Sequence, residues 1–162
     1  MTSPEARNLR PACNFGLVEH PVIYRRKIRF SDSDAQGIVF NANYLRYVDD
    51  AITDYFDALP VGWTDMQARG YELVLGRAEL SFRSSARIGE TLATSVKVVQ
   101  IGTTSVTFGA TIVEEGSGRL VVEGREVQVM VDSATFEKKP VPAWFVEAVE
   151  ELQGSVEWKG RT

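Results

Sequence analysis

The sequence predicts an α+β fold in which an antiparallel sheet of about five strands wraps around one long helix. The first observation is a helical pattern over residues 41–59, the strongest in the chain. The second is a series of four consecutive strand patterns over residues 71–132. The third is that short connections containing glycine join these strands, which favours hairpins and antiparallel pairing. Such a sheet leaves one apolar face, which a long helix can cover.

The composition indicates one globular domain. The length of 162 residues suits a single domain, and 44% apolar and 25% charged residues are ordinary values for a globular protein. The net charge of −4 gives no reason to expect nucleic-acid binding, and no window approaches the ~20 apolar residues of a membrane span. Residues 1–19 lack the apolar segment of a secretory signal, so we expect a cytoplasmic protein. We expect a loose arm over residues 1–19, the domain over residues 20–153 and a polar tail over residues 154–162.

The first strand is predicted over residues 22–30, where apolar and basic residues alternate. Its apolar face comprises Val22, Tyr24, Ile28 and Phe30, and Arg26 interrupts that face. The long helix over residues 41–59 carries an apolar stripe of Tyr44, Val48, Ile52, Tyr55, Phe56 and Leu59. Asn41 or Asn43 is the predicted N-cap, and Pro60 and Gly62 end the helix.

The remaining elements follow in the same way. A short helix precedes Gly70, and strands are predicted over residues 71–83, 90–101, 104–114 and 119–132. The apolar phase changes near Gly124, which predicts a bulge or a strongly bent strand there. Pro142 is expected at the first position of a second amphipathic helix, whose apolar residues are Trp144, Phe145, Ala148, Val149 and Leu152.

The chain has one cysteine and one histidine, which limits the available chemistry. Cys13 cannot form an intramolecular disulfide or a multi-cysteine metal site, and its neighbours supply no base. A histidine-based triad would have to use His20, which lies before the first strand. We interpret both residues as incidental.

The turn between the first strand and the long helix contains Asp32, Asp34 and Gly37. A calcium loop would have a similar acidic start, but Gln36 at its fifth position and Asn43 at its twelfth do not fit. A phosphotransferase nucleophile would need the repeated βα pattern of a doubly wound sheet, which the chain lacks. We interpret Asp32 as a turn residue whose side chain bonds nearby backbone.

Asp34 has a different setting, because the seven residues after it carry no ionisable group and four of them are apolar. Those four are Ala35, Ile38, Val39 and Phe40. The first backbone N–H groups of a helix have no acceptor within it, so they can stabilise a developing oxyanion. A carboxylate beside such donors has the parts needed for acyl transfer, as a nucleophile or as a base for water.

The run from Phe30 to Tyr47, FSDSDAQGIVFNANYLRY, resembles the signature of the 4-hydroxybenzoyl-CoA thioesterase family of hotdog-fold proteins. The resemblance implies a hotdog fold and an acyl-CoA thioesterase that needs no metal or cofactor. It implies that Asp34 is the catalytic carboxylate and that the backbone N–H of Asn41 polarises the thioester carbonyl. The residues it implies for substrate binding are Gly37, Ile38, Val39, Phe40 and Tyr44. The chain departs from the family at Asn41, where tyrosine or histidine is common.

The resemblance also implies a homodimer or homotetramer with active sites near subunit junctions. Arg83, Arg87 and Lys97 are candidates for binding the coenzyme A phosphates by the sign of their charge alone. Two alternatives stay open, namely a thioesterase acting on acyl-carrier protein and a non-catalytic acyl-binding protein. A dehydratase fits less well, because that chemistry pairs an acid with a histidine and His20 lies outside the signature.

Overall fold

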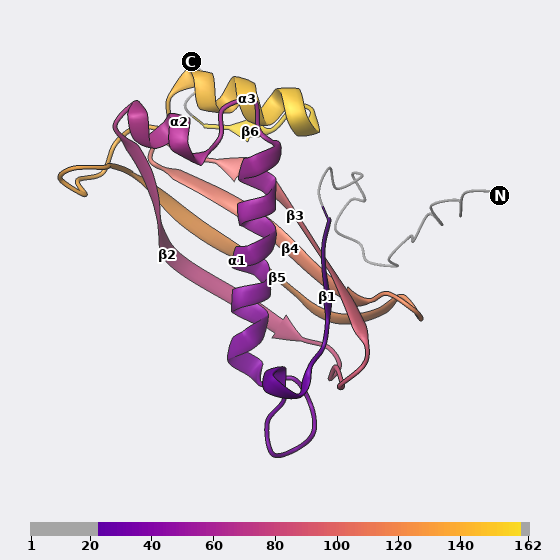
Figure 1. Ribbon diagram of the computed structural model, residues 1–162. Coiled ribbons are helices and arrows are strands. Elements are labelled where there is room, and N and C mark those ends of the chain that lie inside the picture. Colours follow the sequence, from indigo (N-terminus) through magenta and orange to yellow (C-terminus); the bar gives the residue numbers. More distant parts are fainter. Residues whose placement is uncertain (1–22, 160–162) are drawn as a thin grey trace.

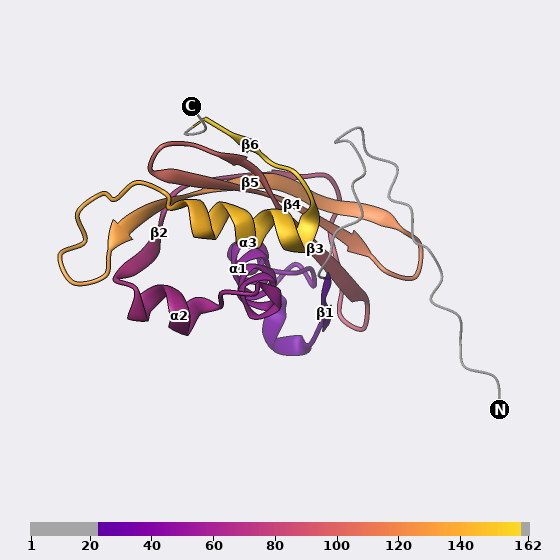
Figure 2. The same cartoon turned by 90° about the horizontal axis from the view of Figure 1, so that it is seen from above.

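Helix α1 lies along the concave face of a curved antiparallel sheet, and α2 and α3 lie near the C-terminal end of α1 (Figure 1, Figure 2). The computed structural model describes residues 23–159, so the predictions for Cys13 and His20 concern residues outside the described part. The elements, in chain order, are β1 (Ile23–Lys27), a 3₁₀ turn (Phe30–Asp32), α1 (Asn41–Ala58), α2 (Trp63–Ala68), β2 (Tyr71–Phe82), β3 (Thr91–Ile101), β4 (Ser105–Glu114), β5 (Arg119–Asp132), α3 (Ala143–Gln153) and β6 (Glu157–Trp158).

The sheet has the strand order β1-β3-β4-β5-β2, and every pair along that path is antiparallel. The predicted α+β class, with an antiparallel sheet around one long helix and a C-terminal helix, is therefore confirmed. The sequence predicted about five strands, whereas the described chain has six. The sixth is β6, which pairs in parallel with β3 through Glu157 and Trp158.

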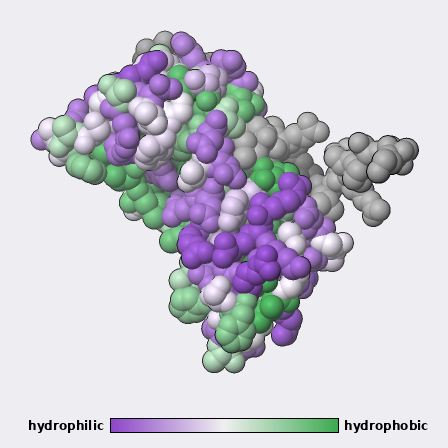
Figure 3. Space-filling view, in the orientation of Figure 1, coloured by the Kyte–Doolittle hydropathy of each residue, from purple (hydrophilic) through white to green (hydrophobic). Residues whose placement is uncertain are grey.

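The core lies between α1 and the sheet. All six residues of the predicted apolar stripe are buried, five on α1 and Leu59 at its C-cap, and Tyr47 and Ala51 extend the stripe. Tyr55 packs edge-to-face on Phe108 of β4, with ring centroids 5.7 Å apart. The opposite side of α1 carries charged and polar residues, which form a hydrophilic band across the face seen in Figure 3.

Three local predictions were wrong. The first strand ends at Lys27 instead of continuing to Phe30, whose side chain is 84% exposed in the following 3₁₀ turn. The N-cap of α1 is Phe40, which has extended backbone angles and makes no side-chain cap. Pro142, which was expected at the first position of α3, is instead its N-cap.

β5 is irregular near Gly124, because its register with β4 shifts where Val122 and Leu120 pair with Ile112 and Val113. Gly124 itself pairs in register with Leu80 and Ala110, so the glycine at this position has another cause. A Cβ atom built there would lie 2.1 Å from the backbone oxygen of Glu79 on the neighbouring strand. Glycine therefore allows β2 and β5 to approach each other closely at this point.

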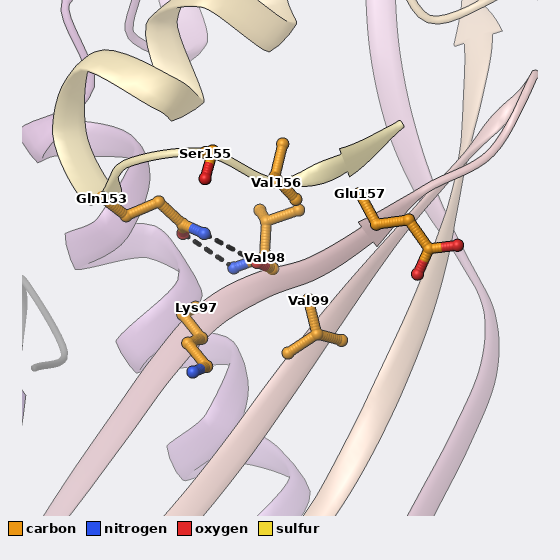
Figure 4. A pocket seen from close by; sticks show the side chains of 7 residues that line it. All are labelled: Lys97, Val98, Val99, Gln153, Ser155, Val156 and Glu157. Atoms are coloured by element: carbon orange, nitrogen blue, oxygen red, sulfur yellow. Dashed lines mark hydrogen bonds between the residues drawn. The ribbon is translucent and has the colours of Figure 1, made fainter. Parts of the chain in front are cut away.

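The end of α3 is tied to a bulge in β3. The register with β4 shifts between Val98 and Gln100, and the side chain of Gln153 serves the backbone of Val98 there (Figure 4). Gln153 Oε1 accepts a hydrogen bond from the Val98 N–H at 2.9 Å, and Gln153 Nε2 donates to the Val98 oxygen at 2.7 Å. Gln153 Oε1 also accepts from the Tyr55 hydroxyl at 2.5 Å. One amide side chain thus joins α1, α3 and β3.

Candidate active site

The turn between β1 and α1 folds back on itself as a small antiparallel ladder. In Figure 1, this turn includes the loop drawn below α1. The Phe40 N–H donates to the Asp32 oxygen at 2.9 Å, and the Asp34 N–H donates to the Ile38 oxygen at 2.9 Å. Gly37 turns the chain with a φ of +73°, a conformation that favours glycine. The ladder brings the chain back from Asp34 to the start of the helix.

Asp32 is buried inside this turn, with 2% of its surface exposed. Its Oδ1 accepts a hydrogen bond from Arg26 Nη2 at 2.6 Å, and its Oδ2 accepts one from the Arg29 N–H at 2.8 Å. Burial alone would raise the pKa of Asp32, but these hydrogen bonds and the Arg26 charge hold that pKa below its ordinary value. Asp32 is therefore an ionised structural residue of the turn.

Asp34 lies two residues further on and is half-buried. Its Oδ1 accepts a hydrogen bond from the Gln36 N–H at 2.8 Å, and this bond forms an Asx turn that holds the carboxylate in place. Its Oδ2 accepts no hydrogen bond from residues 23–159. One carboxylate oxygen thus has free lone pairs at a partly exposed position.

The start of α1 supplies backbone donors. The Asn43 N–H bonds to the Phe40 oxygen at 2.9 Å, whereas the N–H groups of Asn41 and Ala42 have no acceptor in the described chain. These two groups carry the positive end of the helix dipole. A carbonyl oxygen or an oxyanion is the ligand that such donors fit.

Ile38 and Val39 fix the turn to the segment between β2 and β3. Ile38 forms an isolated bridge with Arg87, and the Val39 N–H donates to the Ala86 oxygen at 2.9 Å. Val39 is buried, with 3% exposure, while Ile38 is half-buried. Of these two residues, Ile38 therefore has more surface left for a ligand.

Aromatic side chains border the turn. Phe40 is 49% exposed, and Tyr44, one helical turn later, is buried with 3% exposure. The Tyr44 hydroxyl accepts a hydrogen bond from the Ala86 N–H at 3.3 Å, so the ring, rather than the hydroxyl, faces its aromatic neighbours. One of these is Phe82, which is 56% exposed and whose ring centroid lies 5.8 Å from that of Tyr44. Figure 3 shows hydrophobic side chains gathered at this end of α1.

Phe82 and Asn43 were not among the predicted site residues. Phe82 ends a strand whose alternation was visible, but its position beside Tyr44 depends on β2 pairing with β5. The Asn43 side chain donates to the Asp32 oxygen at 2.9 Å, and the sequence offered only a capping role for it.

The basic candidates divide between two places. Arg83 is paired with Glu123, and Arg87 lies beside Ile38 at the turn. Lys97 lies in the hollow beside Gln153, near the opposite end of α1 (Figure 4), where burial lowers its pKa. Of the three residues predicted to bind the coenzyme A phosphates, only Arg87 therefore lies beside the turn.

Neither a metal site nor a membrane span is visible in the described part. Residues 23–159 contain no cluster of three or more histidine, cysteine or acidic side chains that could hold a metal ion. In the same residues, no helix is long and apolar enough to cross a membrane.

Comparison with known proteins places this chain in a family. Residues 14–149 match the family model described as the thioesterase-like superfamily. A 1,4-dihydroxy-2-naphthoyl-CoA hydrolase from Thermosynechococcus vestitus is 26% identical over 134 residues, which cover 79% of this chain and 90% of that protein. A protein from Bacillus subtilis named as a putative acyl-CoA thioesterase is 23% identical over 122 residues, which cover 73% of this chain and 88% of that protein.

Solved structures show the same fold. A thioesterase from Thermus thermophilus, complexed with coenzyme A and Zn, superposes with a TM-score of 0.73 at 24% identity, covering 84% of this chain and 96% of that chain. A 1,4-dihydroxy-2-naphthoyl-CoA thioesterase from Synechocystis gives a TM-score of 0.72 at 20% identity, covering 81% of this chain and 96% of that chain. The hotdog architecture expected from the sequence is thereby confirmed.

Proposed function

The chain belongs to the thioesterase-like superfamily, and we propose that it hydrolyses an acyl-CoA thioester to a carboxylic acid and free coenzyme A at the turn between β1 and α1. The observation that carries this proposal is the Asp34 carboxylate, half-buried and with one oxygen free, on a ladder that leads back to the unbonded N–H groups of Asn41 and Ala42. The motif from Phe30 to Tyr47 supports membership of the 4-hydroxybenzoyl-CoA thioesterase family within this superfamily.

The helix start is suited to the carbonyl oxygen of the thioester. The backbone N–H of Asn41 donates to that oxygen, and the negative charge that develops on it during the reaction lies at the positive end of α1. The donor belongs to the backbone, so asparagine at position 41 can serve as well as another residue type.

Asp34 can act in two ways. As a nucleophile, its free oxygen attacks the carbonyl carbon, the C–S bond breaks, coenzyme A leaves as a thiolate that takes up a proton, and water then hydrolyses the mixed anhydride. As a general base, Asp34 accepts a proton from water, whose oxygen attacks the carbonyl carbon directly. The C–S bond then breaks, coenzyme A leaves as a thiolate, and the thiolate takes up the proton that Asp34 holds. Both routes consume one water molecule and return Asp34 to its ionised form.

The acyl group is proposed to lie against Ile38 and Phe40, with Gly37 and Val39 shaping the turn and the buried ring of Tyr44 supporting this surface from beneath. The exposed ring of Phe82 adds to this surface. These walls are apolar and aromatic, and such a surface suits an apolar acyl group.

We further propose that the protein is a homo-oligomer built on a dimer that joins two β2 strands. β2 ends the strand order of the sheet, so one of its edges has no partner strand within residues 23–159. An unpaired edge of twelve residues is a template for another strand. The exposed side chain of Leu75 lies on that strand.

The test is release of thiol from a panel of aromatic and aliphatic acyl-CoA thioesters and from the matching thioesters on acyl-carrier protein. We expect Asp34→Asn and Asp34→Ala to lose at least ~100-fold in kcat, the usual effect of removing a positioned acid or base. Asp57→Asn, an exposed acid on the outer face of α1, is the matched control and should keep the wild-type rate. An active wild type whose rate survives in both Asp34 variants would contradict the mechanism, and tight binding without turnover would favour an acyl-binding protein.

A further inference from the structure

We propose that Asp32 is a positioning residue for thioester hydrolysis, because it joins β1 to the start of α1 and so fixes Asp34 relative to the helix amides. The inference rests on the proposed function of Asp34 and deepens it. Asp32 itself is buried, and both of its carboxylate oxygens are occupied by hydrogen bonds, so it has no free group to offer a substrate.

The side chain of Asp32 is anchored to the end of β1. Arg26 and the backbone of Arg29 donate to its two oxygens at 2.6 Å and 2.8 Å. The side chain of Arg26 is 24% exposed and that of Asp32 is 3% exposed, so this ion pair is largely removed from water. Charged hydrogen bonds of this length are strong and geometrically specific.

The backbone of Asp32 is anchored to α1. Its carbonyl oxygen accepts two hydrogen bonds, one from the Phe40 N–H and one from Asn43 Nδ2, both at 2.9 Å. Phe40 is the N-cap of α1 and Asn43 lies in its first turn. One residue therefore ties the strand to the helix start through both its side chain and its carbonyl group.

Asp34 depends on this anchor for its place. Beyond Asp32 the ladder continues through a bridge between Ser33 and Val39 and the hydrogen bond from Asp34 to Ile38. Among residues 23–159, the Asp34 carboxylate accepts a hydrogen bond only from the Gln36 N–H, which sets its rotamer and not its distance from α1. The distance from the carboxylate to the Asn41 amide is thus set by the ladder that starts at Asp32. A misplacement of about 1 Å at a reacting group can cost ~100-fold in rate.

The ion pair also packs on the buried side of α1. The Arg26 guanidinium lies 5.2 Å from the centroid of the Tyr47 ring, and Tyr47 has no exposed surface. Removing one member of a buried pair leaves an uncompensated charge, whereas replacing both members with apolar residues often preserves stability. A double replacement therefore separates positioning from folding.

The experiment measures kcat, KM and the folded fraction for Asn43→Ala, Asp32→Asn and the double variant Arg26→Met/Asp32→Leu. Arg29→Met is the matched control, because it removes a nearby exposed guanidinium and keeps the backbone N–H that bonds to Asp32. We expect kcat to fall about 10- to 100-fold in the three test variants, with KM within about threefold of wild type. Asn43→Ala and the double variant should be fully folded, whereas Asp32→Asn should also be less stable, because it leaves the Arg26 charge unpaired. Arg29→Met should stay within about twofold.

A second readout does not need activity. Hydrogen exchange at the Phe40 amide should accelerate at least about tenfold in Asn43→Ala and in the double variant, because the ladder loses an anchor. Wild-type kcat in all three folded test variants, alongside an inactive Asp34→Asn, would overturn the positioning role and leave the proposed function standing. Unchanged exchange at Phe40 would overturn it whatever the activity. A wild-type enzyme that hydrolyses no thioester would instead count against the proposed function.

Discussion

The hydroxyl of Tyr44, on the first turn of α1, accepts a hydrogen bond at 3.3 Å from the backbone N–H of Ala86, a fully buried residue in the segment before β3. This contact joins the helix start to the segment that also pairs with Val39. It makes the Tyr44 hydroxyl a structural group and leaves its ring for contact with Phe82.

Replacement of Tyr44 with phenylalanine should therefore affect stability more than catalysis. Without the hydroxyl, the buried N–H of Ala86 has no acceptor, which costs about 1–3 kcal/mol of unfolding free energy. Because the ring is kept, KM for an acyl-CoA should stay near the wild-type value. Urea unfolding and thiol-release kinetics measure both effects, with Tyr71→Phe as the control, since the half-buried Tyr71 ring packs on Trp144. A raised KM at unchanged stability would assign the hydroxyl to the substrate instead.

The main elements could be predicted because their patterns repeat over many residues. Alternation over β3, β4 and β5 and the three- and four-residue spacing of α1 each involve several side chains, so one exception does not hide them. β6 has only two residues, and two residues cannot show a period. The strand end at Lys27 was missed because Ile28 and Phe30 continue the alternation, although the chain turns there to bury Asp32.

The residues of the candidate site also differ in whether the sequence alone could predict them. Asp34 and the helix start could be proposed because the motif is contiguous in sequence. The partners of Asp32 could not be predicted, because they belong to two different elements. Arg26 lies on β1 and Asn43 lies on α1, and the sequence does not show that the turn between them brings both side chains to Asp32. Ala86 carries no functional group, so nothing in the sequence marks it as the partner of Tyr44.

Glu126 makes stability depend on pH. It lies on β5 opposite Phe108, has no exposed surface, and its two carboxylate oxygens have no hydrogen-bond partner within residues 23–159. Burial, with the negative charge of Asp49 as a smaller contribution, raises its pKa from 4.5 to about 7. An acid whose pKa is higher in the folded state binds protons more tightly there. Its effect on stability is therefore most favourable below about pH 4.5 and is lost as the pH rises through about 7.

The size of this effect can be measured with Glu126→Gln. The raised pKa corresponds to about 3 kcal/mol between the two limits, so wild type should lose up to that amount of unfolding free energy between about pH 5 and pH 8. Glu126→Gln cannot ionise and should lose less over the same range. Urea unfolding of both proteins at one protein concentration gives the difference. Parallel pH curves for the two would show that Glu126 does not titrate in this range.

Gln153 should be among the most important polar residues for the attachment of α3. Its amide makes three hydrogen bonds, two to the backbone of Val98 and one to the Tyr55 hydroxyl. Gln153→Ala removes all three and should lower the unfolding free energy by about 2–3 kcal/mol, since each bond contributes about 1 kcal/mol. Glu151→Ala, an exposed residue of the same helix, should change it by less than about 0.5 kcal/mol. Faster hydrogen exchange at the Val98 amide in Gln153→Ala alone would locate the loss, and equal stabilities would contradict it.

The final prediction follows from the proposed dimer and concerns the two edges of the sheet. Leu75 on β2 is 47% exposed and Ile23 on β1 is 42% exposed, so the two residues are matched in size and exposure. If two copies pair through β2, Leu75→Glu places like charges near each other in the interface and removes apolar contact, whereas Ile23→Glu adds its charge at the opposite edge. Light scattering on a sizing column should give wild type and Ile23→Glu at least twice the 18.0 kDa chain mass, and Leu75→Glu the single-chain mass at micromolar concentration. A dimer that survives Leu75→Glu but not Ile23→Glu would move the interface to β1, and a wild type at the single-chain mass would contradict the dimer itself.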